Sequence, residues 1–269
     1  MNKTFHANRI HFNACVGFNG NYDIDTYALG YFETVKILIN STLEWKTTLD
    51  AIIYPIVYSA RHYIELTLKH QIRALIYINK IVDSKFNSRI LAIHEISILW
   101  DEFKNMSLVD NRYSDLTKKA EEYINDFSEI DDNGESFRYP YSNENKKHLT
   151  QLYCIDVRDF GVRFFELHEI LEEISWLTGQ LVEEYKQRSF VGGKSRAEIE
   201  EIARKLPSIK TWNHDSFKEI KDKIKIEYQL SSNQLTKIII FIKSHREFSS
   251  LIDNELQLQM SMERLGQKK

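Results

Sequence analysis

The chain has 269 residues, of which 42% are hydrophobic and 12% aromatic, and this suffices for a sizeable core. It contains only nine glycines and three prolines, which disfavours an all-β fold with many turns. The net charge of −3 gives the whole molecule no electrostatic drive toward nucleic acid or membrane. Two cysteines, Cys15 and Cys154, are too few for a disulfide scaffold, the N-terminus has no apolar signal core, and no apolar run approaches the roughly 20 residues needed to span a bilayer. We therefore expect a soluble, cytoplasmic protein without membrane contact.

The first half of the chain carries apolar residues at helical spacing. A first helix is predicted over about 25–46. A second, central helix is expected to start or kink at Pro55 and to run to about residue 82, because proline disfavours helical geometry at the preceding residue. The polar stretch 83–88 predicts a loop.

Two shorter helices are predicted next, over about 94–106 and 108–127. The turn-forming residues of 128–147 indicate a long loop that contains at most a short β-hairpin. A last long helix is expected over 149–187. The pattern predicts an all-α fold, with residues 1–187 as a helical bundle.

The glycine pair in FVGG, residues 190–193, predicts a boundary before a small helical module over 195–269. Three sequences fit a capping box at a helix start, namely Ser195–Glu198, Ser216–Glu219 and Ser231–Gln234. The sequence YQLSSNQLTKIIIFIK, 228–243, is similar to a helix-turn-helix. Its run Ile238–Ile242 is too apolar for a helix that reads a DNA groove, so docking to a partner protein or a second copy is favoured over DNA binding.

Charged residues interrupt the apolar central helix. Arg61, Glu65 and Lys69 are four residues apart and lie on adjoining turns, so Glu65 can pair with both neighbours. We expect His94 and Arg138 to reach the same polar cleft. Two interpretations stay open: a buried ion-pair scaffold, or a site whose surplus positive charge holds phosphate.

Three segments carry a resemblance to a known family: RHYIELTLKH at 61–70, HEISILW at 94–100 and FRYP at 137–140. Together with VGFNGNYDIDTYALGYFETV at 16–35, their order resembles the HEPN superfamily over residues 16–187. The resemblance implies a four-helix-type bundle, frequently dimeric, in a protein of bacterial defence or toxin–antitoxin systems. It also implies that RNA or a nucleotide is bound, and the binding residues we predict are Arg61, His62, Glu65, Lys69, His94, Arg138 and Tyr139.

Nuclease members of that superfamily carry an Arg-x(4–6)-His motif, in which Arg steadies a phosphate and His transfers a proton. The sequence matches it at Arg89–His94 and at Arg163–His168, although Ile90 and Phe164 replace the usual polar residue after the arginine. The resemblance implies Arg163 and His168 as catalytic residues of a metal-independent ribonuclease without a cofactor. The alternative is a non-catalytic regulator or antitoxin-like subunit that binds a nucleotide or a partner protein encoded nearby.

Overall fold

The computed structural model describes seven stretches of the chain: 4–6, 13–17, 23–46, 48–81, 88–187, 190–213 and 215–253. Within these stretches the structure is all-α, as predicted, and contains no β-strand; two isolated antiparallel bridges join Tyr141 to Lys147 and Val191 to Lys194. The predicted loop 83–88 falls almost entirely outside the described residues. None of the helices searched there has the length and apolarity to cross a membrane.

The chain divides into two compact units. The first comprises residues 1–76 and 86–177, and the second comprises 77–85 and 178–269. Each unit is described by itself below.

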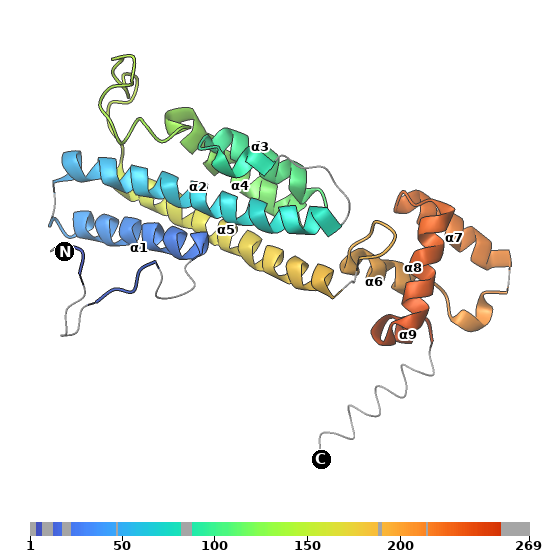
Figure 1. Ribbon diagram of the computed structural model, residues 1–269. Helices are drawn as coiled ribbons and strands as arrows, with labels where there is room; N and C mark the ends of the chain where they lie inside the picture. Colours follow the sequence, from blue (N-terminus) through green and yellow to red (C-terminus); the bar gives the residue numbers. More distant parts are fainter. Residues whose placement is uncertain are drawn as a thin grey trace. The chain divides into compact units, whose positions relative to one another are not determined.

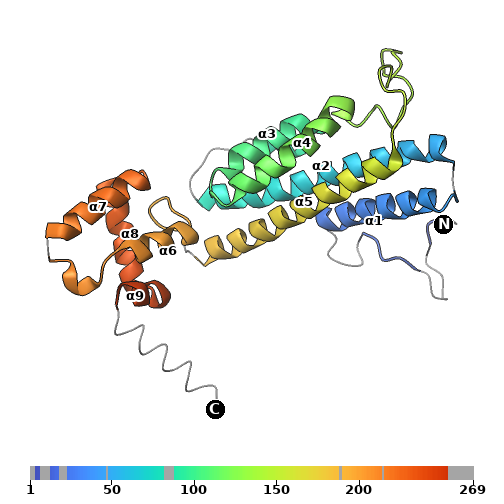
Figure 2. The ribbon, with the colours of Figure 1, turned by 180° about the vertical axis from the view of Figure 1, so that it is seen from behind.

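The first unit contains α1 (Ile24–Leu43), α3 (Ile96–Ser107), α4 (Tyr113–Asp131) and most of α2 (Leu49–Ile81) and α5 (Val157–Lys186), with a short 3₁₀ helix, η1, at Ser88–Ala92. In both ribbon views α2 and α5 lie next to each other, α1 runs along one side of them, and the α3–α4 hairpin covers the other side (Figures 1 and 2). The structure is thus a helical bundle in which α2 is central.

The core of this bundle follows from the apolar stripe of α2. The aliphatic residues on its inner face are completely buried, and these are Ile56, Ile64, Leu68, Ile72 and Leu75. Phe32 of α1 contacts Tyr63 of α2 and Phe164 of α5, with ring centroids 5.7 and 6.0 Å apart. Burying an aliphatic or phenyl side chain of this size contributes about 1.5–3 kcal/mol to folding, so this stripe fixes α2 between its neighbours.

Several predicted helix boundaries differ from the structure; α4, for example, begins at Tyr113 rather than near residue 108. Of the two outcomes predicted at Pro55, a helix start or a kink, the start is wrong, because α2 begins at Leu49 and Pro55 lies inside it. Helix α4 continues to Asp131, into the stretch predicted as loop, because the side chain of Arg61 binds its terminal carbonyls. Helix α5 begins only at Val157, because Asp156 accepts hydrogen bonds from the backbone N–H groups of the first turn and thereby caps it.

The second unit contains four short α-helices and a 3₁₀ turn, η2, at Ile209–Thr211. The α-helices are α6 (Arg196–Lys205), α7 (Asp215–Glu227), α8 (Ser232–Ser244) and α9 (Arg246–Ile252). The capping boxes predicted at Ser195 and Ser231 are confirmed. The box at Ser216 is wrong, since α7 already begins at Asp215 and Ser216 is a helical residue.

The apolar run of α8 is mostly internal to this unit. Ile238 and Ile242 are completely buried in its core, whereas Ile240 is 61% exposed. Gly192 packs against α8 with a positive φ of 65°, and a Cβ there would lie 2.9 Å from the carbonyl oxygen of Gln234. The run therefore does not form the continuous exposed docking face that the sequence suggested, because residues four apart in a helix share a face: Ile238 and Ile242 point inward and Ile240 points outward.

Candidate functional site

The middle of α2 places three charged side chains on one buried face of the first unit. Arg61 and Glu65 are each 2% exposed and Lys69 is 7% exposed. They follow the i, i+4, i+8 spacing of the sequence, so they stand above one another on successive turns. Burial of this kind is tolerated only when the charges are paired and hydrogen-bonded.

Glu65 is the centre of the cluster. Its Oε1 accepts hydrogen bonds from Lys69 Nζ at 2.7 Å and from His94 Nδ1 at 2.8 Å. Its Oε2 accepts from Arg61 Nη1 and lies 3.6 Å from His62 Nδ1. Burial raises the pKa of Glu65, but the hydrogen bonds from His62 and Lys69 and the charges of Arg61 and Lys69 outweigh it and hold that pKa well below its usual range.

Arg61 connects this cluster to the end of α4. Its Nε donates to the backbone carbonyl of Asp131 at 3.2 Å, and its Nη2 donates to the carbonyls of Asp132, at 2.6 Å, and His94. Gly134, with φ of 79°, packs on the guanidinium so closely that a Cβ would lie 3.0 Å from Nη1. All three nitrogens of Arg61 are thus engaged by the protein, and the cluster holds α2, α4 and the segment before α3 together.

Arg138 and Tyr139, from the FRYP segment, lie beside this cluster and not within it. The guanidinium of Arg138 lies over two tyrosine rings, 4.9 Å from the centroid of Tyr139 and 5.8 Å from that of Tyr58. The Tyr58 ring stacks on His62 with centroids 5.8 Å apart and planes 6° apart. His62 in turn approaches Glu65, so a continuous path of contacts runs from Arg138 to the buried carboxylate.

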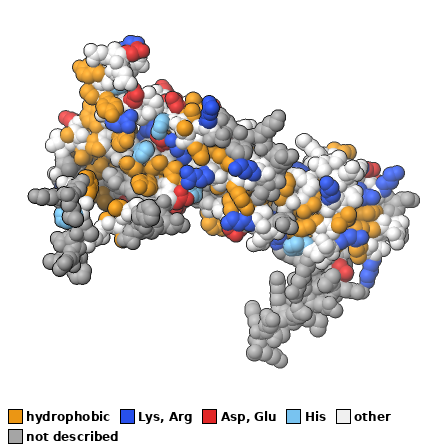
Figure 3. All heavy atoms as spheres, in the orientation of Figure 1, with side chains coloured by type: hydrophobic (Ala, Val, Ile, Leu, Met, Phe, Trp, Pro, Cys, Tyr) orange, Lys and Arg blue, Asp and Glu red, His pale blue; other side chains and the backbone are white. Residues whose placement is uncertain are grey.

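The residues around Arg138 are accessible to solvent, whereas Arg61, Glu65 and Lys69 are buried. Arg138 and Tyr139 are exposed, Tyr58 and His62 are partly exposed, and the side chain of His94 is 67% exposed. Over the described part of the chain the Arg138 side chain makes no ion pair. In Figure 3 basic and histidine side chains lie among hydrophobic ones on the visible face of the first unit. We call Tyr58, His62, His94, Arg138 and Tyr139 the Arg138 surface.

Arg163 and His168 do not meet. Arg163 Nη2 donates to Glu122 at 3.0 Å and Asp126 at 2.6 Å, both on α4. His168 is directed to the opposite side, where its ring stacks on Phe32 with centroids 3.7 Å apart. Five residues on one helix correspond to a turn of about 500°, which leaves the two side chains roughly 140° apart.

The surroundings of His168 are those of a core residue. Its Nδ1 lies 2.7 Å from the Tyr63 hydroxyl, and burial lowers the pKa of His168. The neutral ring therefore accepts a hydrogen bond from Tyr63, whose own pKa is raised by burial. Within one chain, this pair does not present an arginine and a histidine to a common phosphate.

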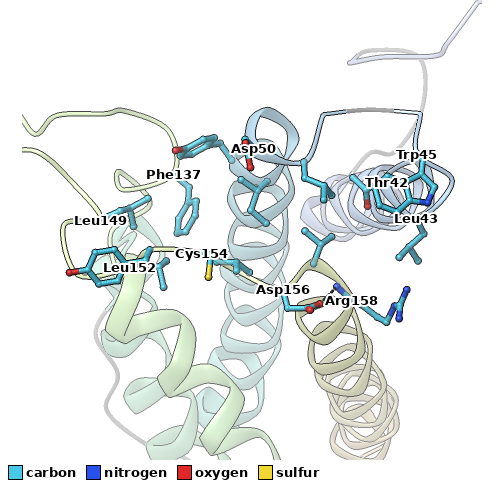
Figure 4. A pocket seen from close by; sticks show the side chains of 16 residues that line it. Thr42, Leu43, Trp45, Asp50, Phe137, Leu149, Leu152, Cys154, Asp156 and Arg158 are labelled. Carbon is cyan, nitrogen blue, oxygen red and sulfur yellow. Dashed lines mark hydrogen bonds between the residues drawn. The ribbon is translucent and has the colours of Figure 1, made fainter.

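A cavity of about 770 Å³, which no sequence pattern predicted, lies at the end of the bundle. Figure 4 shows Phe137, Leu149, Leu152 and Cys154 on one side of it, Thr42, Leu43 and Trp45 on the other, and Asp156 and Arg158 at the start of α5. The extended segment before α5 supplies six of the residues that line it, namely Leu149 and those from Leu152 to Asp156. That segment was predicted to be helical, so its cavity-forming role was missed.

Comparisons with known proteins give no relative of this chain: no protein-family model, no curated protein and no solved structure matches it. Among the described residues there is also no group of three His, Cys, Asp or Glu side chains arranged to hold a metal ion.

Proposed function

We propose that the first unit is a HEPN-like binding subunit that holds RNA or a nucleotide at the Arg138 surface. The observation that carries this proposal is the exposed guanidinium of Arg138, which lies over Tyr58 and Tyr139 without a carboxylate partner among the described residues. A guanidinium binds phosphate through paired hydrogen bonds, and adjacent tyrosine rings offer faces on which bases stack.

The histidines support the same ligand class. His62 stacks on Tyr58, and His94 exposes most of its ring beside Glu65. The ring of His94 is largely exposed, and His62 is partly exposed beside Tyr58, so either imidazole can bind a second phosphate or a ribose hydroxyl. Residues 1–187 hold 20 basic against 28 acidic residues, so this attraction is local to the Arg138 surface and we expect strong weakening by salt.

The proposal is tested with a fluorescein-labelled single-stranded RNA and, in a second arm, with ATP. Arg138→Ala should weaken binding at least tenfold, since a charge-assisted hydrogen bond contributes about 1.5–3 kcal/mol. For RNA, the slope of log K against log salt should fall by about 0.7, the value for one lost phosphate contact on a single strand. Tyr139→Ala should weaken binding without altering that slope.

Arg204→Ala is the matched control, because it removes the same charge from an exposed arginine of α6 that already pairs with Glu200 at 2.7 Å. It should leave affinity unchanged. Unaltered binding in Arg138→Ala, or equal losses in both variants, would contradict the proposal. Binding of RNA but not ATP would identify the polymer as the ligand, and the reverse would identify the nucleotide.

The nuclease alternative depends on Arg163 and His168. Arg163 is held by two carboxylates of α4 and His168 by Tyr63 and Phe32, which favours a binding subunit over a ribonuclease. If the wild-type protein cleaves RNA and both His168→Ala and Arg163→Ala lose this activity, the ribonuclease hypothesis would be supported. Bacterial defence or toxin–antitoxin biology is proposed on the resemblance of the sequence segments alone.

A further inference from the structure

The cavity of about 770 Å³ at the end of the bundle is lined by aromatic side chains from four separate segments, and we call it the Trp45 cavity. Trp45 comes from the turn after α1, Tyr54 from α2, Phe137 from the FRYP segment and Tyr153 from the segment before α5. Figure 4 shows Phe137 and Trp45 on opposite sides of it. The volume is within the range of small-molecule sites, and a flat ligand that enters it meets ring surfaces.

Five large apolar side chains around this cavity are exposed to solvent. Trp45 and Tyr153 are 86% and 95% exposed, and Leu43, Leu49 and Tyr54 are exposed as well. Single exposed apolar residues need no explanation, but several gathered around one cavity form a patch of the kind that marks a binding site.

The backbone at Trp45 is held in a costly conformation. Its φ of 58° lies in the left-handed region, where a bulky side chain is rare. Trp45 follows the C-cap residue Glu44, a position at which a left-handed residue is most often glycine. Strained residues of this kind cluster at functional sites. Because the indole is largely exposed, its ring surface is available to a ligand.

Three charged side chains line the same cavity: Asp50, Asp156 and Arg158. Asp156 caps α5, since its Oδ1 accepts hydrogen bonds from the backbone N–H groups of Arg158 and Asp159. The Asp50 carboxylate is exposed and accepts no hydrogen bond from any residue that the structure describes. With two carboxylates against one arginine, the cavity disfavours a phosphate inside it. It fits an uncharged flat body with an amino group that donates to Asp50.

Two neighbouring residues of the FRYP segment join the Trp45 cavity to the Arg138 surface. The ring of Phe137 lies 6.2 Å from that of Tyr54, and the guanidinium of Arg138 lies 5.8 Å from the ring of Tyr58. Tyr54 and Tyr58 are one turn apart on α2, about 6 Å along its axis. A phosphate bound at Arg138 is therefore next to the cavity, at about the separation of phosphate and base in a nucleotide chain.

We propose that the Trp45 cavity takes up a base of the RNA strand whose phosphate is bound by Arg138. The base stacks on the exposed indole of Trp45, and its exocyclic amino group donates to Asp50. Cytosine fits better than uracil, because uracil presents a carbonyl oxygen where cytosine presents the amino group, and the carboxylate repels that oxygen. The inference rests on the proposed function at the Arg138 surface and adds a base preference to it.

The test uses three fluorescein-labelled hexamers of equal charge: hexacytidylate, hexauridylate and an abasic hexamer in which hydrogen replaces each base. Wild-type protein should bind hexacytidylate at least fivefold more tightly than either of the others, since one stacked base or one base-edge hydrogen bond changes affinity by about fivefold or more. Equal affinity for hexacytidylate and either of the other hexamers would overturn the inference.

Two variants locate the base. Trp45→Ala should weaken hexacytidylate binding at least fivefold and leave the abasic hexamer unaffected. Its matched control is Trp176→Ala, which removes an exposed tryptophan of α5 outside the cavity and should leave both affinities unchanged. Asp50→Asn should abolish the preference for hexacytidylate over hexauridylate, because an amide can present either its oxygen or its NH₂ group to the base.

Arg138→Ala separates this inference from the function on which it rests, because it should weaken the binding of all three hexamers. If Arg138→Ala weakens binding and Trp45→Ala does not, the base pocket is wrong and the proposed function stands. If neither variant alters binding, or if no hexamer binds, both are wrong. Should Trp45→Ala fold poorly by circular dichroism, the comparison of the three hexamers on wild-type protein still decides the matter.

Discussion

The Glu65 cluster and the Arg138 surface use similar residue types on the same stretch of α2, yet their environments give them different roles. In the cluster, Arg61, Glu65 and Lys69 are nearly inaccessible, and their polar groups pair with one another or with backbone carbonyls. On the surface, Arg138 is exposed and lies over aromatic rings. A charged motif in a helix therefore indicates a ligand site only where some of its donors have no partner within the protein.

The largest effect should come from removing the shared carboxylate of the cluster. Glu65→Ala leaves Arg61 and Lys69 buried without their anion and should lower the free energy of unfolding by about 3–5 kcal/mol. Urea denaturation followed by circular dichroism measures it. Glu33→Ala, which removes an exposed partner of Lys36 on α1, should change stability by less than about 0.5 kcal/mol. Similar losses in the two variants would contradict a buried network.

The stability of the protein at low pH should depend on the Glu65 cluster. The pKa of Glu65 in the folded protein lies well below its ordinary value of 4.5, so its contribution to stability is complete above about pH 4.5 and is lost as pH falls toward the folded pKa. Wild-type protein should therefore lose stability below that pH more steeply than Glu65→Gln, which has no carboxyl group to protonate. Parallel pH profiles for the two proteins would argue that Glu65 is not paired as described.

The close packing of Gly134 on the Arg61 guanidinium gives a further test of the buried cluster. Gly134→Ala requires an L-residue at a φ of 79° and brings a Cβ within 3.1 Å of Arg61 Cζ, so it should cost about 1–2 kcal/mol or more. The control is Gly30→Ala in α1, where the added Cβ meets nothing within 4 Å. That control should be neutral or stabilising by up to about 1 kcal/mol. Thermal denaturation of both variants measures the difference.

Arg163 and His168 offer a smaller test. Because they contact different helices and share no partner, Arg163→Ala and His168→Ala should change stability additively within about 0.3–0.5 kcal/mol. A double-mutant cycle measures the coupling. A coupling above about 1 kcal/mol would show that the two side chains act together after all.

The fold class and the burial of helices α2 and α5 could be predicted from the sequence, because a 3.6-residue apolar stripe is a local pattern. The close approach of Arg61, Glu65 and Lys69 followed from the same periodicity. What could not be predicted depends on distant contacts. The hydrogen bond from Arg61 to the carbonyl of Asp131 joins residues 70 apart in the sequence and extends α4. No local sequence pattern near residue 131 predicts it.

The separation of Arg163 from His168 could not be predicted for the same reason. Sequence spacing placed Arg163 and His168 on one helix but did not say which neighbour each would face. Nor did it show that the Ile238–Ile242 run would be largely buried within its own unit. The start of α5 could have been predicted from Asp156, since an aspartate before a helical stretch is a favoured N-cap.

The most direct test of the account measures stability and RNA affinity together in Arg138→Ala. We expect a melting temperature within about 2 °C of wild type, because an exposed side chain contributes little to folding, and an affinity for RNA at least tenfold lower. Should Arg138→Ala lower stability by several kcal/mol and leave RNA and ATP affinity unchanged, the Arg138 surface would be scaffold like the Glu65 cluster, and the proposed binding function would be wrong.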